Sequence, residues 1–157
     1  MKKRIKFFSA LLAVTLAMLL LPCKASAVVV VADTDPLVTR VANTINNERI
    51  ARGLVPLEVT ADLSGCASIR AIDISYRFSH ARRDGSPWYS VRPDIQFGET
   101  IGRETIGRDF YATDIASFWL RNPSHSSVLL YPSFRTIGLG YRVGSDGLRY
   151  WTAEFGY

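Results

Sequence analysis

The first 27 residues have the pattern of a secretory signal peptide, and this feature decides which part of the chain is available to fold. A basic start at residues 2–6 precedes an apolar stretch of roughly 15 residues, 7–21, and the small residues Ala25-Ser26-Ala27 follow. This pattern predicts cleavage after Ala27 and a secreted, extracytoplasmic protein. The apolar stretch is shorter than the roughly 20 residues of a membrane-spanning helix, so we expect no stable membrane span. A retained membrane anchor is the alternative.

Removal of this segment changes the charge balance of the chain. The whole sequence has 19 Lys and Arg against 14 Asp and Glu, a formal net charge of +5. Residues 1–27 contain Arg4 and every lysine of the chain, five basic residues together, so 19 minus these five leaves 14 arginines against 14 acids. A balanced charge gives no support for binding nucleic acid or an anionic membrane surface by bulk electrostatics.

Cysteine placement limits how the remaining chain can be stabilised. Cys23 lies within the predicted signal peptide and only Cys66 follows it, so no intramolecular disulfide is expected. The roughly 130 residues after Ala27 must therefore fold on a hydrophobic core. Cys66 lies on an apolar stripe, which favours a buried thiol over a catalytic one. Lipid attachment at Cys23 is a further alternative, although Pro22 stands where lipoprotein signals carry a small residue.

Hydrophobic spacing predicts helices in the first part of the chain and again near its middle. Apolar residues recur at helical intervals over about residues 36–52, 61–76 and 109–120. Ser124 is expected to cap a short turn after the last of these helices. Residues 77–97 are rich in turn-forming residues and predict a long loop, which in a compact domain tends to carry function.

Strands are predicted mainly at the C-terminal end. Residues 97–105 form an extended segment, and residues 137–143 and 150–155 alternate around the turn Gly144–Gly147, which predicts a β-hairpin. Gly138 and Gly140 fall on one face of its first strand and indicate close packing of another element there. Helices and strands in this order predict a layered α+β domain.

Two histidines and one acid are the natural candidates for a shared site. His80 and His125 stand in polar, turn-rich sequence, and Glu99 lies in an otherwise apolar extended segment. Such a set suits a divalent metal such as zinc, and equally a metal-free acid/base pair in which the carboxylate orients an imidazole. Their intervals of 19 and 26 residues match no local metal motif. Ser79 and Ser124, each beside a histidine, are alternative nucleophiles.

A set of short motifs follows one another along most of the chain. These motifs are Ile45–Leu57, Leu63–Ala67, Arg70-Ala71, Phe78-Ser79-His80 with Arg82 and Asp84-Gly85, Gly98-Glu99, Trp119–His125, Ile137–Gly140, Tyr150-Trp151 and Phe155-Gly156. In this order they resemble the minimal bacterial branch of the CAP superfamily, also called SCP-like, which groups cysteine-rich secretory proteins, antigen 5 and pathogenesis-related 1 proteins. The resemblance implies a three-layer α-β-α sandwich. It divides the chain into a signal peptide (1–27), an N-terminal extension (28–36) and one CAP domain (37–157).

The resemblance also implies a cleft with two histidines and two acids, which in some members holds zinc. The first histidine matches His80, the first acid matches Glu99, and the second histidine matches His125. The second acid falls on Asn122, which can be neither a base nor a good metal ligand. The implied cleft residues are therefore His80, Glu99, Asn122 and His125 with Arg82 at the rim, and the implied zinc ligands are His80, His125 and Glu99.

These residues lead to three hypotheses about function. The first is a secreted CAP protein whose cleft binds an unknown ligand or a cell-envelope component, with zinc held in the cleft. The second is a hydrolase of peptides or cell-envelope material in which Glu99 or His125 activates water. The third is a structural or adhesive module with a vestigial cleft, in which residues 77–97 contact a partner through exposed Trp88 and Tyr89. Within this loop, Arg82 and Asp84 are expected to pair with each other.

Overall fold

The computed structural model describes residues 35–106 and 113–157, so the predicted signal peptide and the first residues of the predicted helix 109–120 lie outside the described residues. The elements are, in chain order, α1 (Pro36–Ala51), β1 (Glu58–Val59), α2 (Ala61–Tyr76), the 3₁₀ turn η1 (Trp88–Val91), β2 (Gly98–Thr105), α3 (Thr113–Arg121), α4 (Pro123–Leu129), β3 (Thr136–Val143) and β4 (Leu148–Gly156).

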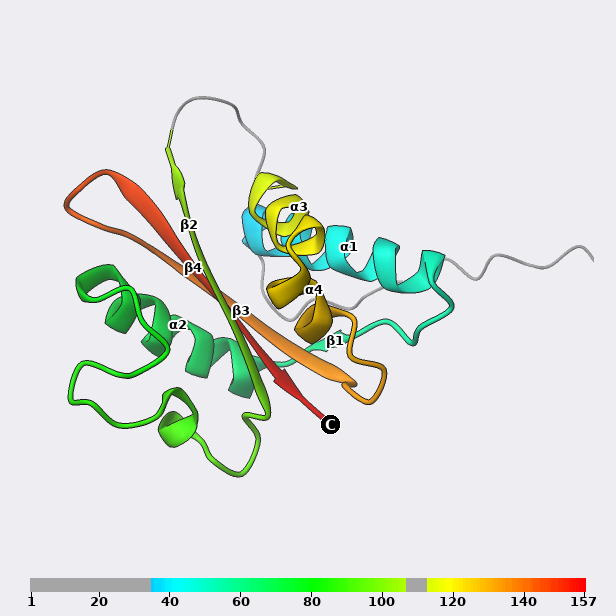
Figure 1. Ribbon diagram of the computed structural model, residues 1–157, viewed down its shortest axis with the longest axis horizontal. Coiled ribbons are helices and arrows are strands. Elements are labelled where there is room, and N and C mark those ends of the chain that lie inside the picture. Colours follow the sequence, from blue (N-terminus) through cyan, green and yellow to red (C-terminus); the bar gives the residue numbers. More distant parts are fainter. Residues whose placement is uncertain (1–34, 107–112) are drawn as a thin grey trace, which may run out of the picture.

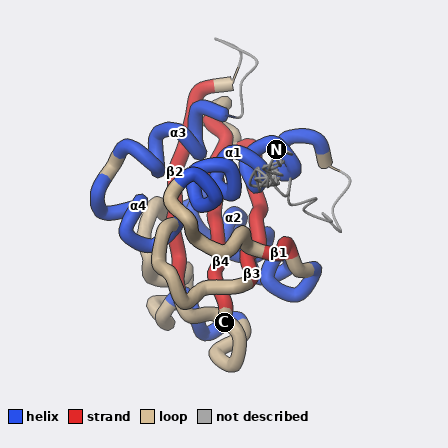
Figure 2. Tube along the Cα trace, turned by 90° about the vertical axis from the view of Figure 1, so that its right-hand side faces the viewer, coloured by secondary structure: helices blue, strands red, loops and turns tan. Residues whose placement is uncertain are grey.

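The strands form one sheet that lies between two layers of helices, which confirms the predicted α-β-α sandwich (Figure 1). The strand order is β1-β3-β4-β2, with β1 parallel to β3 and the other neighbours antiparallel. Helix α2 covers one face of the sheet, and α1, α3 and α4 cover the other (Figure 1). Figure 2 looks onto the face that carries α1, α3 and α4. No helix in the ranges 35–106 and 113–157 is long and apolar enough to cross a membrane.

Helix α2 packs unusually close to β3, because that strand carries glycine where a side chain would collide. A Cβ atom on Gly138 would lie 1.9 Å from the Leu63 carbonyl carbon, and one on Gly140 would lie 2.6 Å from the Ser68 nitrogen. This confirms the close packing predicted from the two glycines. On the neighbouring strand, the Thr152 hydroxyl donates to the Ala67 carbonyl of the helix at 2.5 Å. The close approach holds the polar residues of α2 directly above β4 and β2.

The larger apolar core fills the space between the sheet and helices α1, α3 and α4. Trp119 and Trp151 are both fully buried there. A smaller cluster lies between α2 and the sheet, where Ile74 of α2 packs with Ile101 and Tyr150. Cys66 is buried on this helix with a free thiol whose pKa is raised by burial, as expected for a structural cysteine.

Two local features differ from the sequence prediction. Strand β1 is only two residues long and was not predicted, because it is defined by its pairing with the distant β3. Helix α4 is capped by Asn122 and not, as predicted, by Ser124. The Asn122 side-chain oxygen accepts hydrogen bonds from the Ser124 nitrogen at 3.1 Å and from the Ser124 hydroxyl at 2.8 Å. Asn122, which the resemblance places at the second acid position, therefore caps the N-terminus of α4.

Candidate functional site

The candidate site lies at the edge strand β2, where Glu99 points into the layer beneath α2. The Glu99 side chain is 1% exposed, and its carboxylate faces Arg70, whose side chain is fully buried. Arg70 Nε donates to Glu99 Oε2 at 2.7 Å and Nη2 donates to Oε1 at 3.3 Å. This two-point contact gives the buried guanidinium of Arg70 an acidic partner within hydrogen-bond distance.

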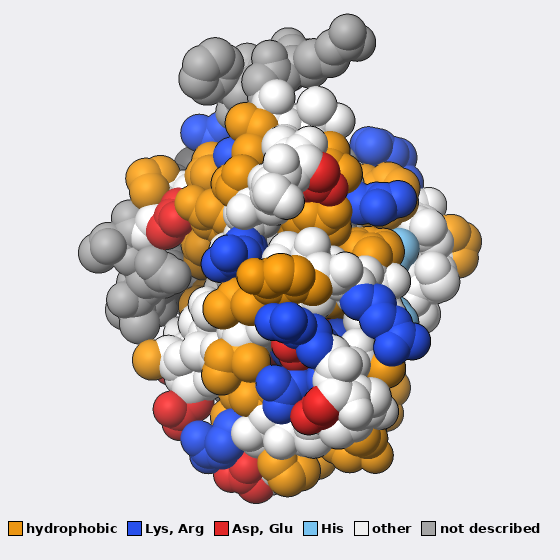
Figure 3. All heavy atoms as spheres, turned by 90° about the vertical axis from the view of Figure 1, so that its left-hand side faces the viewer, with side chains coloured by type: hydrophobic (Ala, Val, Ile, Leu, Met, Phe, Trp, Pro, Cys, Tyr) orange, Lys and Arg blue, Asp and Glu red, His pale blue; other side chains and the backbone are white. Residues whose placement is uncertain are grey.

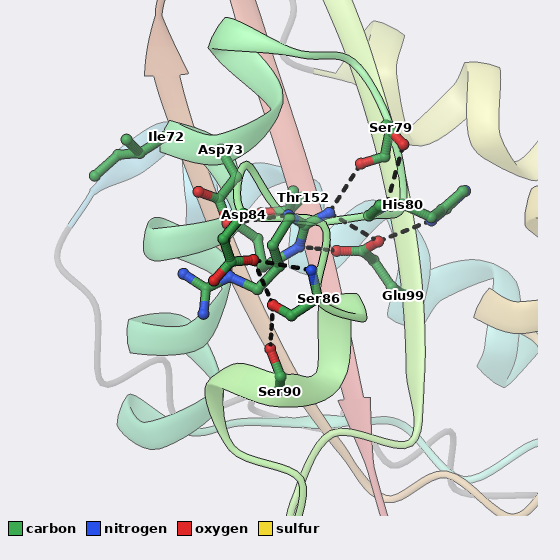
Figure 4. A network of polar contacts seen from close by, with 12 residues as sticks. Ile72, Asp73, Ser79, His80, Asp84, Ser86, Ser90, Glu99 and Thr152 are labelled. Carbon is green, nitrogen blue, oxygen red and sulfur yellow. Dashed lines mark hydrogen bonds and ion pairs between the residues drawn. The ribbon is translucent and has the colours of Figure 1, made fainter.

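His80 is held by the same carboxylate but remains open to solvent. Its Nδ1 lies 2.8 Å from Glu99 Oε1, while 59% of its side chain is exposed. An ionised carboxylate can only accept, so this contact assigns the hydrogen to Nδ1 and leaves Nε2 as the outward-facing nitrogen. Figure 4 shows the ring extending from Glu99 away from the remaining polar network. The structure therefore brings together two of the predicted site residues.

The loop that carries His80 is fastened to α2 by two residues that the sequence analysis did not single out for the site. Arg70 Nη2 donates to the Ser79 carbonyl at 2.9 Å, and Arg70 Nη1 contacts Asp73 at 3.1 Å. Asp73 in turn accepts from Arg82 Nε at 2.8 Å. Both Arg70 and Asp73 fall within the predicted helix 61–76, but their partners Ser79, Arg82 and Glu99 lie beyond that helix.

The predicted pairing of Arg82 with Asp84 is wrong. Arg82 bonds to Asp73 across the layer, and Asp84 instead accepts from the Ser86 nitrogen at 2.9 Å and the Ser86 hydroxyl at 2.6 Å. These bonds to Ser86 lower the pKa of Asp84. A carboxylate that bonds two residues ahead closes a local turn, so Asp84 shapes the loop and leaves Arg82 free to bond to α2.

His125 approaches the site from the opposite layer. It lies on α4, half-buried, with its ring 5.6 Å from that of Phe118. Its Nδ1 is buried and makes no hydrogen bond within the described part of the chain. Burial lowers the pKa of His125, and the charge of His80 lowers it further, which indicates that the two imidazoles lie near one another. Asn122 is occupied as the helix cap and adds no acid to this pair.

A second buried acid, Glu154, was missed by the sequence analysis. It lies on β4 directly opposite Glu99, and its side chain is fully buried. Neither of its carboxyl oxygens makes a hydrogen bond within residues 35–106 and 113–157. Burial raises the pKa of Glu154 well above 4.5, and the negative charge of Glu99 raises it further. The pattern Tyr150, Thr152, Glu154 on one face of an alternating strand was the only signal that could have indicated it.

As the side chains are arranged here, they do not form a ready-made three-ligand zinc site. Among the described residues, no group of three or more His, Cys, Asp or Glu side chains could hold a metal ion. Both oxygens of Glu99 are engaged by Arg70 and His80, so the imidazoles of His80 and His125 are the remaining donors. Zinc sites in proteins use three or four protein ligands.

The surface around α2 carries both positive and negative side chains (Figure 3). Every blue side chain in Figure 3 is an arginine, since the described residues contain no lysine, and hydrophobic and acidic side chains lie between them. The pale-blue histidine atoms lie at the edge of this view, beside arginine side chains. What distinguishes the site is the ordered contact between His80 and Glu99.

Comparison with known proteins gives the family. The model of the family described as "CAP: Cysteine-rich secretory protein family" matches residues 42–155. The chain belongs to this family. It is 28% identical over 123 residues to the Bacillus subtilis protein YkwD, a relative described as uncharacterized, in a match that covers 74% of this chain and 45% of YkwD. The chain thus spans less than half the length of that relative.

Solved structures of CAP and SCP proteins share the fold. An outer surface protein from Borrelia burgdorferi has a TM-score of 0.63 at 19% identity, covering 79% of this chain and 94% of that one. An extracellular protein containing an SCP domain from Bacillus anthracis has a TM-score of 0.57 at 16% identity, covering 75% and 40%. NaASP2, solved with Zn²⁺, has a TM-score of 0.62 at 11% identity, covering 78% and 80%. At these identities the likeness supports the fold alone.

Proposed function

We propose that this CAP domain acts outside the cytoplasm and binds a component of the bacterial cell envelope at the face formed by His80, Glu99 and His125. Export is supported by the predicted signal peptide at residues 1–27. An outer surface protein and an extracellular protein share the fold. Fold alone does not fix a ligand in a family with many roles, so the proposal rests on the chemistry of the site.

The observation that carries the proposal is the 2.8 Å contact between His80 and the buried Glu99. It orients an exposed imidazole before any ligand arrives, which lowers the entropic cost of binding. The outward Nε2 accepts a hydrogen bond from a ligand hydroxyl or amide, and it donates one when the ring is protonated. Arg82, anchored by Asp73 and 24% exposed, offers a guanidinium at the rim.

Co-sedimentation of the chain beginning at Val28 with purified peptidoglycan sacculi tests this proposal. We expect the wild-type protein to sediment and His80→Ala to lose at least about 80% of that binding, since one well-placed hydrogen bond is worth about 1 kcal/mol or more. Ile50→Ala, an exposed substitution on α1, is the matched control and should bind like wild type. Equal sedimentation of wild type and His80→Ala would contradict the proposal. Loss with Tyr89→Ala alone, whose ring is 45% exposed, would instead favour the adhesive loop.

A hydrolase is the second candidate, and the same contact favours it. A carboxylate that orients an imidazole with a free Nε2 is the arrangement of a general base. His80 would then take a proton from water while Glu99 stabilises the imidazolium, and Asn122 supplies no second acid. The sacculi assay separates the two functions: release of soluble fragments that stops in His80→Ala indicates hydrolysis, whereas sedimentation without release indicates binding.

Zinc binding by His80, His125 and Glu99 stays a prediction. It would require Glu99 to exchange contacts with Arg70 or His80 for the metal. Calorimetric titration of the mature protein with zinc checks it, with His80→Ala and His125→Ala as the variants. If the two imidazoles hold the metal, each substitution removes most of the heat. Equal heats from all three proteins would remove zinc from the site.

A further inference from the structure

Two pockets adjoin at the end of the sheet where β2 begins and the chain ends. The first, here called the aromatic pocket, has a volume of about 230 Å³ and lies among residues of β2, α4 and the C-terminus. The second, the acidic pocket, has a volume of about 250 Å³ and includes Thr60, Asp62, Asp94 and Thr136. Phe97 and Tyr157 line both pockets.

Phe97 and Tyr157 form the wall between these pockets. Their ring centroids are 4.7 Å apart, and the residues are 47% and 62% exposed. Large aromatic side chains exposed together on a surface mark a contact site more often than isolated ones do. Tyr157 also lies 5.5 Å from Phe134, which stacks on the buried Phe155 and anchors the wall to the core.

The aromatic pocket combines ring faces with hydroxyl groups. Tyr131, 44% exposed, packs edge-on against Phe134 at 5.0 Å, and Ser127 adds a hydroxyl from α4. Gly98 forms part of the lining, and a Cβ there would lie 2.8 Å from the Phe134 ring. A pyranose ring has the matching chemistry, because its C–H groups pack on aromatic faces and its hydroxyls bond at the edge. At about 230 Å³ the pocket lies below the roughly 300–1,000 Å³ of sites that enclose drug-sized ligands, so it suits a single ring.

The side chains that line the acidic pocket favour a sugar over an acyl chain as the ligand. Asp62 and Asp94 contribute carboxylates, and Thr60 and Thr136 contribute hydroxyl-bearing side chains. Arg92 donates to both oxygens of Asp94, at 3.0 and 2.8 Å, and this contact lowers the pKa of Asp94. Fixed carboxylates accept hydrogen bonds from sugar hydroxyls, whereas they are unfavourable neighbours for an acyl chain and repel an anionic sugar.

We infer that these two pockets form a binding site for a neutral oligosaccharide, with one pyranose ring in each pocket and the Phe97–Tyr157 wall between them. Each pocket is of one-ring size, and the two offer complementary partners for the apolar and polar sides of a sugar. None of the residues used here belongs to the His80–Glu99 contact. The site therefore does not depend on the function proposed above.

Calorimetric titration with the neutral trisaccharides triacetylchitotriose, cellotriose and maltotriose tests this inference on the chain beginning at Val28. We expect saturable binding of at least one of them below about 10 mM. Phe97→Ala and Tyr157→Ala should each weaken it by about tenfold or more, whereas Phe97→Tyr should retain it. Both positions are largely exposed, so the variants should fold. Tyr76→Ala, an exposed aromatic on α2, is the control and should bind like wild type.

Three results would overturn the inference. The first is the absence of saturable binding to all three neutral sugars. The second is binding that survives both Phe97→Ala and Tyr157→Ala, since the sugar would then lie elsewhere. The third is equal or tighter binding of trigalacturonate, because Asp62 and Asp94 should repel its carboxylates.

Discussion

At the scale of single residues, two glutamates that pair across β2 and β4 have different surroundings. Glu99 accepts two hydrogen bonds from Arg70 and contacts His80. Neither carboxyl oxygen of Glu154 makes a hydrogen bond within the described ranges, and burial beside Glu99 raises the pKa of Glu154. Two adjacent buried carboxylates cannot both ionise at low cost. These surroundings therefore favour a neutral Glu154 beside Glu99.

The raised pKa of Glu154 predicts how stability depends on pH. Its pKa lies above 4.5 in the folded state, so folding retains a proton that the unfolded chain releases above this pH. The stability contributed by Glu154 is fully present below about pH 4.5 and is lost as the pH rises through the folded pKa. A glutamine, always neutral, avoids this loss. We expect Glu154→Gln to match wild type near pH 4 and to become the more stable protein above it, by up to about 1.4 kcal/mol per pH unit until the folded pKa is reached.

Urea unfolding of both proteins between about pH 4 and pH 8 measures this difference. His125, whose pKa is lowered by burial, is present in both proteins, so its contribution cancels from the comparison. Glu58→Gln, an exposed substitution on β1, is the control and should show no such trend. A stability difference between Glu154→Gln and wild type that stays constant with pH would contradict a protonated Glu154.

At the scale of secondary-structure elements, the sequence predicted what depends on local pattern and missed what depends on distant pairing. Helix α2 was predicted at about its observed bounds, 61–76, because its apolar residues recur at helical intervals. The β3–β4 hairpin followed from alternation around a glycine turn. Strand β1 was missed because its two residues form a strand only by pairing with β3, which lies far away in the sequence.

The same division applies to the candidate site. The residue types of His80, Glu99 and His125 indicated a shared site, and the structure places His80 in contact with Glu99. The partners of Glu99 could not be predicted, since Arg70 lies 29 residues away in sequence and is one of several polar residues on its helix. Glu154 was hidden because an acid in an apolar strand can face either layer until the pairing register is known.

At the scale of the whole molecule, two fully buried arginines join distant segments, one for the fold and one for the site. Arg49, at the end of α1, donates to four backbone carbonyls at 2.6–3.2 Å, those of Val55, Leu129, Tyr131 and Phe134. It thereby joins the first helix to the end of α4 and to the segment between α4 and β3. Arg70 joins α2 to β2 and to the loop that carries His80. Both use the planar fork of the guanidinium to reach several acceptors at once.

Because Arg49 joins segments of the fold and Arg70 holds the site, replacing each of them with lysine should affect His80 differently. Lysine keeps the positive charge but donates from a single nitrogen, so it cannot reach all the acceptors that the arginine fork reaches. Arg49→Lys and Arg70→Lys should therefore each leave buried acceptors unpaired and lower the free energy of unfolding by about 2–4 kcal/mol. Only Arg70→Lys should also move the ring signals of His80 in ¹H–¹³C NMR spectra, because only Arg70 fixes Glu99 and the Ser79 carbonyl. Urea unfolding supplies the first measurement on the two variants. Unchanged His80 signals in Arg70→Lys, or equal changes in Arg49→Lys, would show that the orientation of His80 depends on the fold as a whole and not on Arg70.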